Sequence, residues 1–312
     1  MLFIIKIIIS VILLFYYDLW TVPYPICFGI PESKIVSKVP PKTLTFAKII
    51  PGNLKTYIYD SEATYYKGYQ DAYYGFTWKK AGWDCMRHYE ILANGCVPYF
   101  PNLKSSHIKT MFRLPRELIT EAMQLPGVAY GTIDFTKFDQ EKYDLIANKL
   151  LDYTRTHLTT RSIAQYVLDT MGYSGQGKVL FLGENIRTPD YLKTTVLIGL
   201  KEILGDKVVD YPREDYIYTD YPKNSLVLYG KGFSYAKTIV DTPIDRTNIK
   251  QRIENKEFEL IIYGYVHHGR SFYKSVLQHY PAAKIAYLCS SERHKCEYAH
   301  LQNLFIREYD EA

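Results

Sequence analysis

Residues that could bind an anionic ligand are concentrated in one block of the chain, residues 73–101. The block predicts a strand over 72–77, a basic turn, a helix that ends at Asn94-Gly95, and a second strand over 97–100. The candidate binding residues lie in the turn and on the helix: Lys79, Lys80, Trp83, Asp84, Arg87 and Glu90. Free backbone N–H groups and the helix dipole favour an anion at a strand-to-helix turn, so the pattern predicts a site for a phosphorylated ligand.

These residues also have a simpler interpretation. Lys79 and Lys80 could form a solvated turn, and Arg87 and Glu90, three residues apart on the helix, could be a surface ion pair of little energetic value. A plain amphipathic helix does not need so many acidic, basic and aromatic side chains within two turns. This density favours the binding site.

Further candidates follow two predicted strands in the second half of the chain. His267 and His268 end an apolar strand over 258–266, at the carboxyl end where parallel sheets place catalytic groups. The histidines are candidate general bases, and a purely structural role is the alternative. Glu292 occupies the same position after the next predicted strand and is a third candidate.

Composition limits the classes of protein that are possible. The chain has 312 residues, 47% of them hydrophobic and 23% charged, and a net charge of +5. These values are typical of a globular protein. Lysine and arginine never occur more than two in a row, which argues against nucleic acid as a partner. The 31 tyrosines reflect either nucleotide bias in the genome or rings that stack on sugars.

Several motifs of cofactor and metal sites are missing from the sequence. It contains no P-loop, no G-x-G-x-x-G and no D-x-D. Its five cysteines form no C-x-x-C pair, and no histidine–cysteine group has the sequence spacing of zinc ligands. We therefore expect no disulfide framework, no bound cofactor and no metal ion at the site.

Strands and helices alternate along the chain and predict an α/β protein with parallel sheets covered by helices. Helices are expected over 61–70, 116–124, 138–156, 160–171, 189–204, 248–255 and 271–279; strands over 26–30, 43–49, 179–183, 208–211, 258–266 and 284–289. A Gly-rich turn at 172–177 divides the chain into domains 21–172 and 173–312. We expect two Rossmann-like domains that face a cleft.

The first twenty residues form a hydrophobic segment of their own. Residues 2–17 are apolar except for Lys6 and Ser10, and bulky aromatic residues follow. About 20 apolar residues span a bilayer comfortably, so this stretch is short for that purpose. We expect a short N-terminal signal-anchor that associates the protein with a membrane, in the cytoplasm or in the secretory lumen; a buried core element is the alternative.

The segment GWDCMRHYEILANGCVPYFPNL (residues 82–103) resembles the donor-site block of exostosin-like glycosyltransferases of the GT-B fold. The likeness is dense over about thirty residues. The second half is similar to the acceptor-side domain of the same proteins, in VVDYP (208–212), LYGKGFSY (228–235), FELIIYG (258–264) and KIAYLC (284–289). In those relatives the acceptor half comes first, whereas here the donor half does. The chain therefore looks circularly permuted.

The resemblance implies transfer of a sugar from a nucleotide-sugar to a glycan or glycoprotein acceptor. Lys79, Lys80 and Arg87 would stabilise the charge on the leaving nucleoside diphosphate, and the absence of D-x-D favours a metal-independent route. Glu90 would accept hydrogen bonds from ribose or sugar hydroxyls, and Trp83 could pack against a ring. A non-catalytic module that binds sugar-nucleotides or glycans is the alternative function.

Overall fold

The computed structural model describes residues 22–184, 189–292 and 296–309. The predicted N-terminal anchor lies outside these residues. Within the described part of the chain, no helix combines the length and the apolar character needed to cross a membrane.

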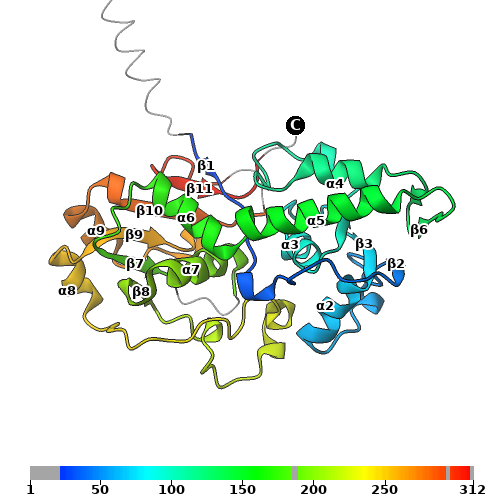
Figure 1. Ribbon diagram of the computed structural model, residues 1–312. Coiled ribbons are helices and arrows are strands. Elements are labelled where there is room, and N and C mark those ends of the chain that lie inside the picture. The colour runs from blue at the N-terminus through cyan, green and yellow to red at the C-terminus, as the bar shows by residue number, and fades with distance from the viewer. Residues whose placement is uncertain (1–21, 185–188, 293–295, 310–312) are drawn as a thin grey trace, which may run out of the picture.

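The larger of the two parallel sheets has six strands and is built from both ends of the chain (Figure 1). Its strand order is β1 (Tyr24–Pro25), β11 (Leu304–Ile306), β10 (Ile285–Cys289), β9 (Phe258–Tyr263), β7 (Lys178–Leu182) and β8 (Val208–Tyr211), and every neighbouring pair is parallel. The N-terminal β1 thus pairs with the C-terminal β11, which closes one edge of this sheet.

Helices cover both faces of the large sheet. Successive side chains of a strand point to opposite faces, and in these strands the side chains on both faces are apolar and must be buried. In β7, Val179 and Phe181 pack into one buried cluster, whereas Leu180 and Leu182 pack into another. The first cluster includes α6 (Thr160–Thr170) and α7 (Tyr191–Leu204). The second includes α8 (Ile249–Glu254) and α9 (Tyr273–His279). The large sheet is therefore the middle of three layers.

The smaller parallel sheet has three strands in the order β2 (Leu44–Phe46), β3 (Ala72–Phe76), β4 (Val97–Tyr99). Around it lie α2 (Glu62–Gln70), α3 (Met86–Ala93), α4 (Arg116–Met123) and α5 (Gln140–His157), with a hairpin of β5 (Val128–Ala129) and β6 (Thr132–Ile133) at the far end (Figure 1). Short 3-10 helices connect the elements: η1 (Glu32–Lys34), η2 (Leu54–Thr56), η3 (Leu103–Ser105), η4 (Gly205–Lys207), η5 (Asp215–Ile217), η6 (Ser225–Val227), η7 (Tyr229–Gly232), η8 (Val266–His268) and η9 (Ala282–Lys284).

One hydrophobic cluster connects the two sheets. It runs from Tyr74 and Phe76 in β3, through Tyr89 in α3, to Val196 and Leu200 in α7. Figure 1 shows α5 and α6 following each other along this side of the molecule, α5 beside the small sheet and α6 beside the large one. The expected boundary at 172–177 is a turn between α6 and β7, and both of these elements contribute side chains to this cluster.

The α/β class with helix-covered parallel sheets is confirmed, and most predicted elements occur within a few residues of their expected limits. The strand predicted over 26–30 is wrong, because the pairing segment is Tyr24–Pro25 and Ile30 makes only an isolated bridge. Strand β11 was not among the predicted strands. Both errors concern the same sheet edge, where the partners lie at opposite ends of the chain.

Candidate ligand-binding cleft

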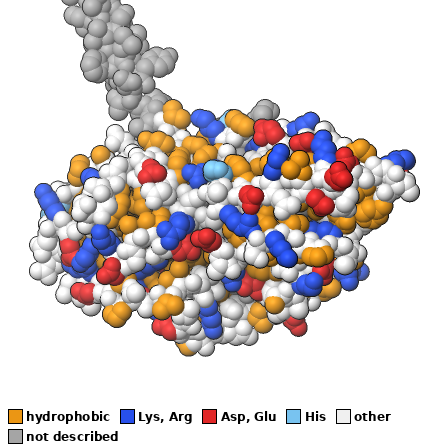
Figure 2. Space-filling view, in the orientation of Figure 1, with side chains coloured by type: hydrophobic (Ala, Val, Ile, Leu, Met, Phe, Trp, Pro, Cys, Tyr) orange, Lys and Arg blue, Asp and Glu red, His pale blue; other side chains and the backbone are white. Residues whose placement is uncertain are grey.

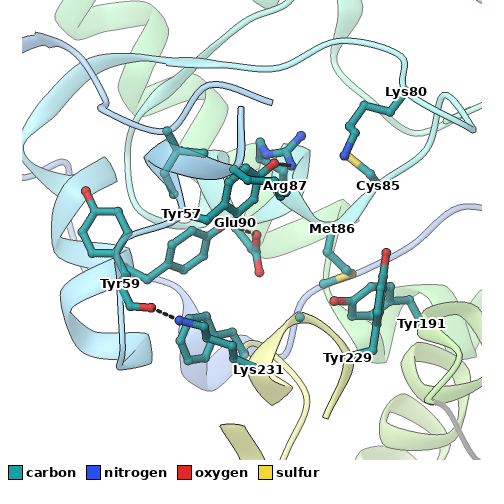
Figure 3. A pocket seen from close by; sticks show the side chains of 15 residues that line it. Tyr57, Tyr59, Lys80, Cys85, Met86, Arg87, Glu90, Tyr191, Tyr229 and Lys231 are labelled. Carbon is teal, nitrogen blue, oxygen red and sulfur yellow. Dashed lines mark hydrogen bonds between the residues drawn. The ribbon is translucent and has the colours of Figure 1, made fainter. Parts of the chain in front are cut away.

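A cavity of about 380 Å³ lies between α2 and α3 on one side and the segment 229–233 on the other. This volume is within the range of about 300–1,000 Å³ that is typical of small-ligand sites. Its charged lining residues are Lys80, Arg87, Glu90 and Lys231; its aromatic ones are Tyr57, Tyr59, Tyr65, Tyr191, Tyr229 and Phe233. Figure 3 shows these side chains arranged around a central space, with contributions from both halves of the chain.

Helix α3 presents Arg87 and Glu90 to this cavity because the two residues lie three apart, on one face of the helix. The opposite face packs Tyr89 and Leu92 into the core. The helix ends before Gly95, which has φ +63°, and a Cβ there would lie 2.9 Å from Pro40. Glycine is therefore required at this helix end.

Arg87 is the cation whose side chain is best oriented to bind an anionic ligand. Its Nη2 donates to the Tyr57 hydroxyl at 3.0 Å, whereas its Nη1 is buried and has no hydrogen-bond partner among the described residues. A buried N–H group without a partner is unfavourable, and an incoming acceptor such as a phosphate oxygen would satisfy it. The guanidinium is thus oriented by one bond and keeps donors available.

Glu90 joins the two sides of the cleft. Its side chain, 6% exposed, accepts hydrogen bonds of 2.5 Å from the hydroxyls of Tyr65 and Ser234. Burial raises the pKa of Glu90 above its usual range, although the two hydroxyl donors act in the opposite direction. Ser234 also donates its backbone N–H to Glu62 of α2 at 2.6 Å. The wall formed by segment 229–234 is therefore fixed to both α2 and α3.

Segment 229–234 has an unusual backbone. Gly230, Lys231, Gly232 and Ser234 all have positive φ values, between 58° and 72°. A Cβ on Gly230 would lie 2.2 Å from the Tyr191 hydroxyl, so glycine is needed for this close approach. The Lys231 ammonium group donates to the carbonyl oxygen of Tyr59 across the cleft (Figure 3). Strained backbone of this kind is often found at binding sites.

Cys85 lines the same cavity and has a histidine beside it. Its sulfur lies 3.5 Å from Nε2 of His88. Burial alone would raise the pKa of Cys85, but the positive charge of His88 and Arg87 outweighs it and lowers the pKa to about 7. The cavity therefore contains a thiol whose thiolate form is favoured near neutral pH more than in an ordinary cysteine.

The remaining candidates from the basic turn lie at or behind the cavity wall. Lys80 is exposed and lines the cavity, whereas Lys79 lies over the Trp83 ring, 5.1 Å from its centroid. Trp83 and Asp84 are 1% and 2% exposed and line no described cavity.

Asp84 instead links the loop before α3 to both ends of the chain. Its carboxylate accepts from the Phe28 N–H at 2.9 Å and from the Tyr89 hydroxyl at 2.8 Å. Its backbone N–H donates to Glu308, and its carbonyl accepts from Arg307. Asp84 thus fixes the turn from which the lysines extend.

A second cavity, of about 720 Å³, adjoins the first. Tyr191 and Tyr229 line both, and the neighbouring residues Lys80 and Ala81 each line one. Besides these, the second cavity is lined by Phe28, Pro189, Asp190, Tyr265, His267, Ser290, Ser291, Glu292 and Arg307. The arrangement offers a place for a second ligand next to the first.

The two histidines predicted as candidate general bases have different surroundings. His267 lines the second cavity, and its Nε2 lies 3.1 Å from the sulfur of Cys289. His268 is exposed and stacks on Tyr265, with ring centroids 4.6 Å apart. Glu292 is exposed at the rim of the same cavity as His267.

Sequence reasoning missed half of this cleft. It did not identify Tyr57, Tyr59, Tyr65 and Tyr191 as lining residues, and residues 228–235 were noted only for their resemblance to the acceptor-side domain. The only available signal was the Gly-x-Gly spacing at 230–232, which is weak by itself.

On the face shown in Figure 2, lysine and arginine side chains are interspersed with aspartate and glutamate, and no broad basic stripe is visible. Positive charge is instead gathered inside the cleft, from Lys80, Arg87 and Lys231. Such a site favours a small anion over an extended polyanion.

Comparisons with protein-family models, with curated protein sequences and with solved structures found no match to this chain. The geometry of the cleft and the resemblance of residues 82–103 are the features from which a function can be inferred.

Proposed function

We propose that the protein is a glycosyltransferase that moves a sugar from a nucleotide-sugar to a glycan or glycoprotein acceptor. The observation that carries the proposal is the cavity that combines three cations, one buried acid and six aromatic rings at a strand-to-helix turn. A nucleotide-sugar has complementary groups: a diphosphate for the cations, hydroxyls for the acid, and a base and a sugar ring for the aromatic side chains.

The diphosphate is assigned to the upper end of the cavity in Figure 3, near Arg87 and Lys80. Arg87 has a buried donor without a partner among the described residues, and Lys80 extends from the turn after β3. Fixed cations stabilise a leaving nucleoside diphosphate as its charge develops. This arrangement, together with the lack of D-x-D in the sequence, supports transfer without a divalent metal ion at the diphosphate.

The acceptor is assigned to the second cavity, because Tyr191 and Tyr229 line both spaces. An inverting transfer needs a base within reach of the acceptor hydroxyl. His267, Asp190 and Glu292 line this cavity. Nε2 of His267 is directed at Cys289, and the Asp190 carboxylate accepts the Lys193 N–H at 2.8 Å as the cap of α7. Glu292 at the rim is therefore our preferred base, with His267 and His268 as the alternatives from the sequence.

This proposal includes the two-domain GT-B arrangement and the permuted order suggested by the resemblance. The small sheet with α2 and α3 would be the donor side, and the large sheet would be the acceptor side. In a permuted chain the first and last strands were continuous neighbours in the parent fold, and the pairing of β1 with β11 in one sheet agrees with this.

A non-catalytic module that binds sugar-nucleotides or glycans is the second candidate function. It would need the cations of the first cavity but no base in the second. The two functions therefore differ in what Glu292 and the histidines do, and not in donor affinity.

The test is a thermal-shift panel of nucleotide-sugars on the full chain, followed by a transfer assay with the donor that stabilises it. A ligand that binds only the folded state at about 100 times its Kd adds about 2.7 kcal/mol to the free energy of unfolding. We expect Glu292→Gln to keep this shift and to lose about 10²–10⁴-fold in transfer rate.

His267→Gln and His268→Gln serve as the comparison for the base. A larger loss of rate in either histidine variant than in Glu292→Gln would transfer the role to that histidine. A stabilising donor with no transfer to any acceptor in the wild-type chain would favour the binding module. No stabilisation by any nucleotide-sugar would refute both the glycosyltransferase and a module that binds sugar-nucleotides.

A further inference from the structure

Three potential metal ligands meet beside the second cavity. They are a ring nitrogen of His267 and the sulfur atoms of Cys289 and Cys296, and these three atoms lie within 4.8 Å of one another. Nε2 and the Cys289 sulfur are 3.1 Å apart. In a tetrahedral zinc site with bonds of about 2.3 Å to sulfur and 2.0–2.1 Å to nitrogen, neighbouring ligand atoms are about 3.5–3.8 Å apart. The Nε2–Cys289 distance is shorter than that range and the other two separations are at most 4.8 Å, so small side-chain rotations would close the site.

The fold holds these ligands at the carboxyl ends of two neighbouring interior strands of the large sheet. Cys289 is the last residue of β10, and His267 lies in η8, just after the neighbouring strand β9. Cys296 comes from the connection between β10 and β11.

We propose that His267, Cys289 and Cys296 bind one Zn²⁺ ion, with a water molecule in the fourth position. Two thiolates and an imidazole form a soft donor set that selects zinc over Mg²⁺ or Mn²⁺, which prefer oxygen ligands. When the metal binds, Zn–S and Zn–N bonds form and each bound thiol releases its proton to solvent. The ion links the carboxyl ends of β9 and β10 to the connection between β10 and β11. It thereby stabilises the wall of the second cavity.

This site is separate from the cavity assigned to the donor. None of its three residues lines the cavity assigned to the donor, and a zinc ion here does not touch the diphosphate. Zinc binding would, however, engage His267 and so remove it as a general base.

The experiment is a metal titration of the full chain, purified under reducing conditions and stripped of metal. We expect about one Zn²⁺ per chain by mass spectrometry of the eluted metal. Co²⁺, used as a spectroscopic probe, should show the intense near-ultraviolet absorption of thiolate-to-cobalt charge transfer. Cys289→Ser, Cys296→Ser and His267→Gln should each weaken Zn²⁺ binding by about a hundredfold or more, because each removes one of three protein ligands.

Cys96→Ala is the matched control, because Cys96 is a buried free thiol in the small-sheet core. It should leave the zinc content and the cobalt spectrum unchanged. The wild-type spectrum alone keeps the test decisive if a ligand variant does not fold.

Three results would overturn the proposal. The first is a reduced wild-type chain that binds no stoichiometric Zn²⁺, or whose cobalt complex lacks the thiolate band. The second is unchanged Zn²⁺ affinity after Cys289 and Cys296 are both replaced by serine. The third is a Cys289–Cys296 disulfide whose reduction yields no metal binding. Sugar transfer appears in none of these readouts, so either proposal can fail without the other.

Discussion

Replacement of Arg87 by methionine should separate donor binding from folding. In the free protein, Arg87 makes one hydrogen bond, from Nη2 to Tyr57, and its buried Nη1 has no partner among the described residues. Methionine keeps most of the aliphatic length and removes every donor. The protein therefore loses one neutral-acceptor bond, worth about 1 kcal/mol, and also loses the cost of a buried cation. We expect the free energy of unfolding to change by about 1 kcal/mol or less.

The donor complex should lose far more. A charged hydrogen bond contributes about 1.5–3 kcal/mol, and the guanidinium can offer two parallel donors to a diphosphate. A loss of about 3 kcal/mol corresponds to an increase in Kd of about 150-fold. Arg87→Lys keeps the charge without the paired donors, so its Kd should increase by roughly tenfold.

Isothermal calorimetry with the stabilising nucleotide-sugar measures these constants, and chemical denaturation measures the stability. Arg161→Met is the charge-matched control, because Arg161 is exposed on α6, away from the cleft. An Arg87→Met protein that is folded and binds the donor as tightly as wild type would refute the assignment of the diphosphate.

Three further predictions concern the same cleft. Glu90→Gln should weaken donor binding by about tenfold or more in calorimetry, because one charged acceptor is lost. Burial raises the pKa of Glu90 above its usual value near 4.5. The wild-type protein should therefore lose stability relative to this variant as the pH rises above that value. Unchanged donor affinity would remove Glu90 from the site. Alkylation of Cys85 by iodoacetamide, followed by peptide mass spectrometry, should accelerate as pH rises through about 7 and slow at saturating donor; no protection by donor would contradict the cavity assignment. Transfer should survive brief EDTA treatment; a loss that only Mn²⁺ or Mg²⁺ restores would contradict the metal-independent route, whereas restoration by Zn²⁺ would indicate the thiolate site.

Local sequence patterns were sufficient to predict those helices and strands whose formation depends mainly on residues nearby in the chain. Helix α3 was predicted from an apolar stripe at helical spacing and from the stop at Gly95, and both operate over a few residues. The parallel strands β7, β9 and β10 were predicted because each is a short apolar run bounded by turns or helices.

The cleft could not be predicted in the same way, because its contacts join distant segments. Ser234 reaches Glu90 across 144 positions, and Lys231 reaches Tyr59 across 172. No periodicity in a single segment encodes such a pairing. The residues predicted on α3 divide accordingly: Arg87 and Glu90 line the cavity, whereas the position of Asp84 depends on Phe28 and on the C-terminal residues that hold it.

The cysteine cluster was missed for a related physical reason. Zinc motifs are recognised when ligands are close in sequence, but His267 and Cys289 are 22 residues apart. They meet because β9 and β10 are neighbours in a parallel sheet, so the residues at or just after the carboxyl ends of these two strands lie close together. Cys296 then returns to that edge from the following connection.

Hydrogen exchange of the full chain, measured with and without saturating nucleotide-sugar, tests the central claim most directly. If the donor lies in the cleft between the two halves, its binding should protect three segments together: 57–65, 80–90 and 229–235. The Arg87→Met variant at the same donor concentration should show much weaker protection. Protection confined to one half of the chain, or donor binding that leaves 229–235 unprotected, would contradict a shared nucleotide-sugar site.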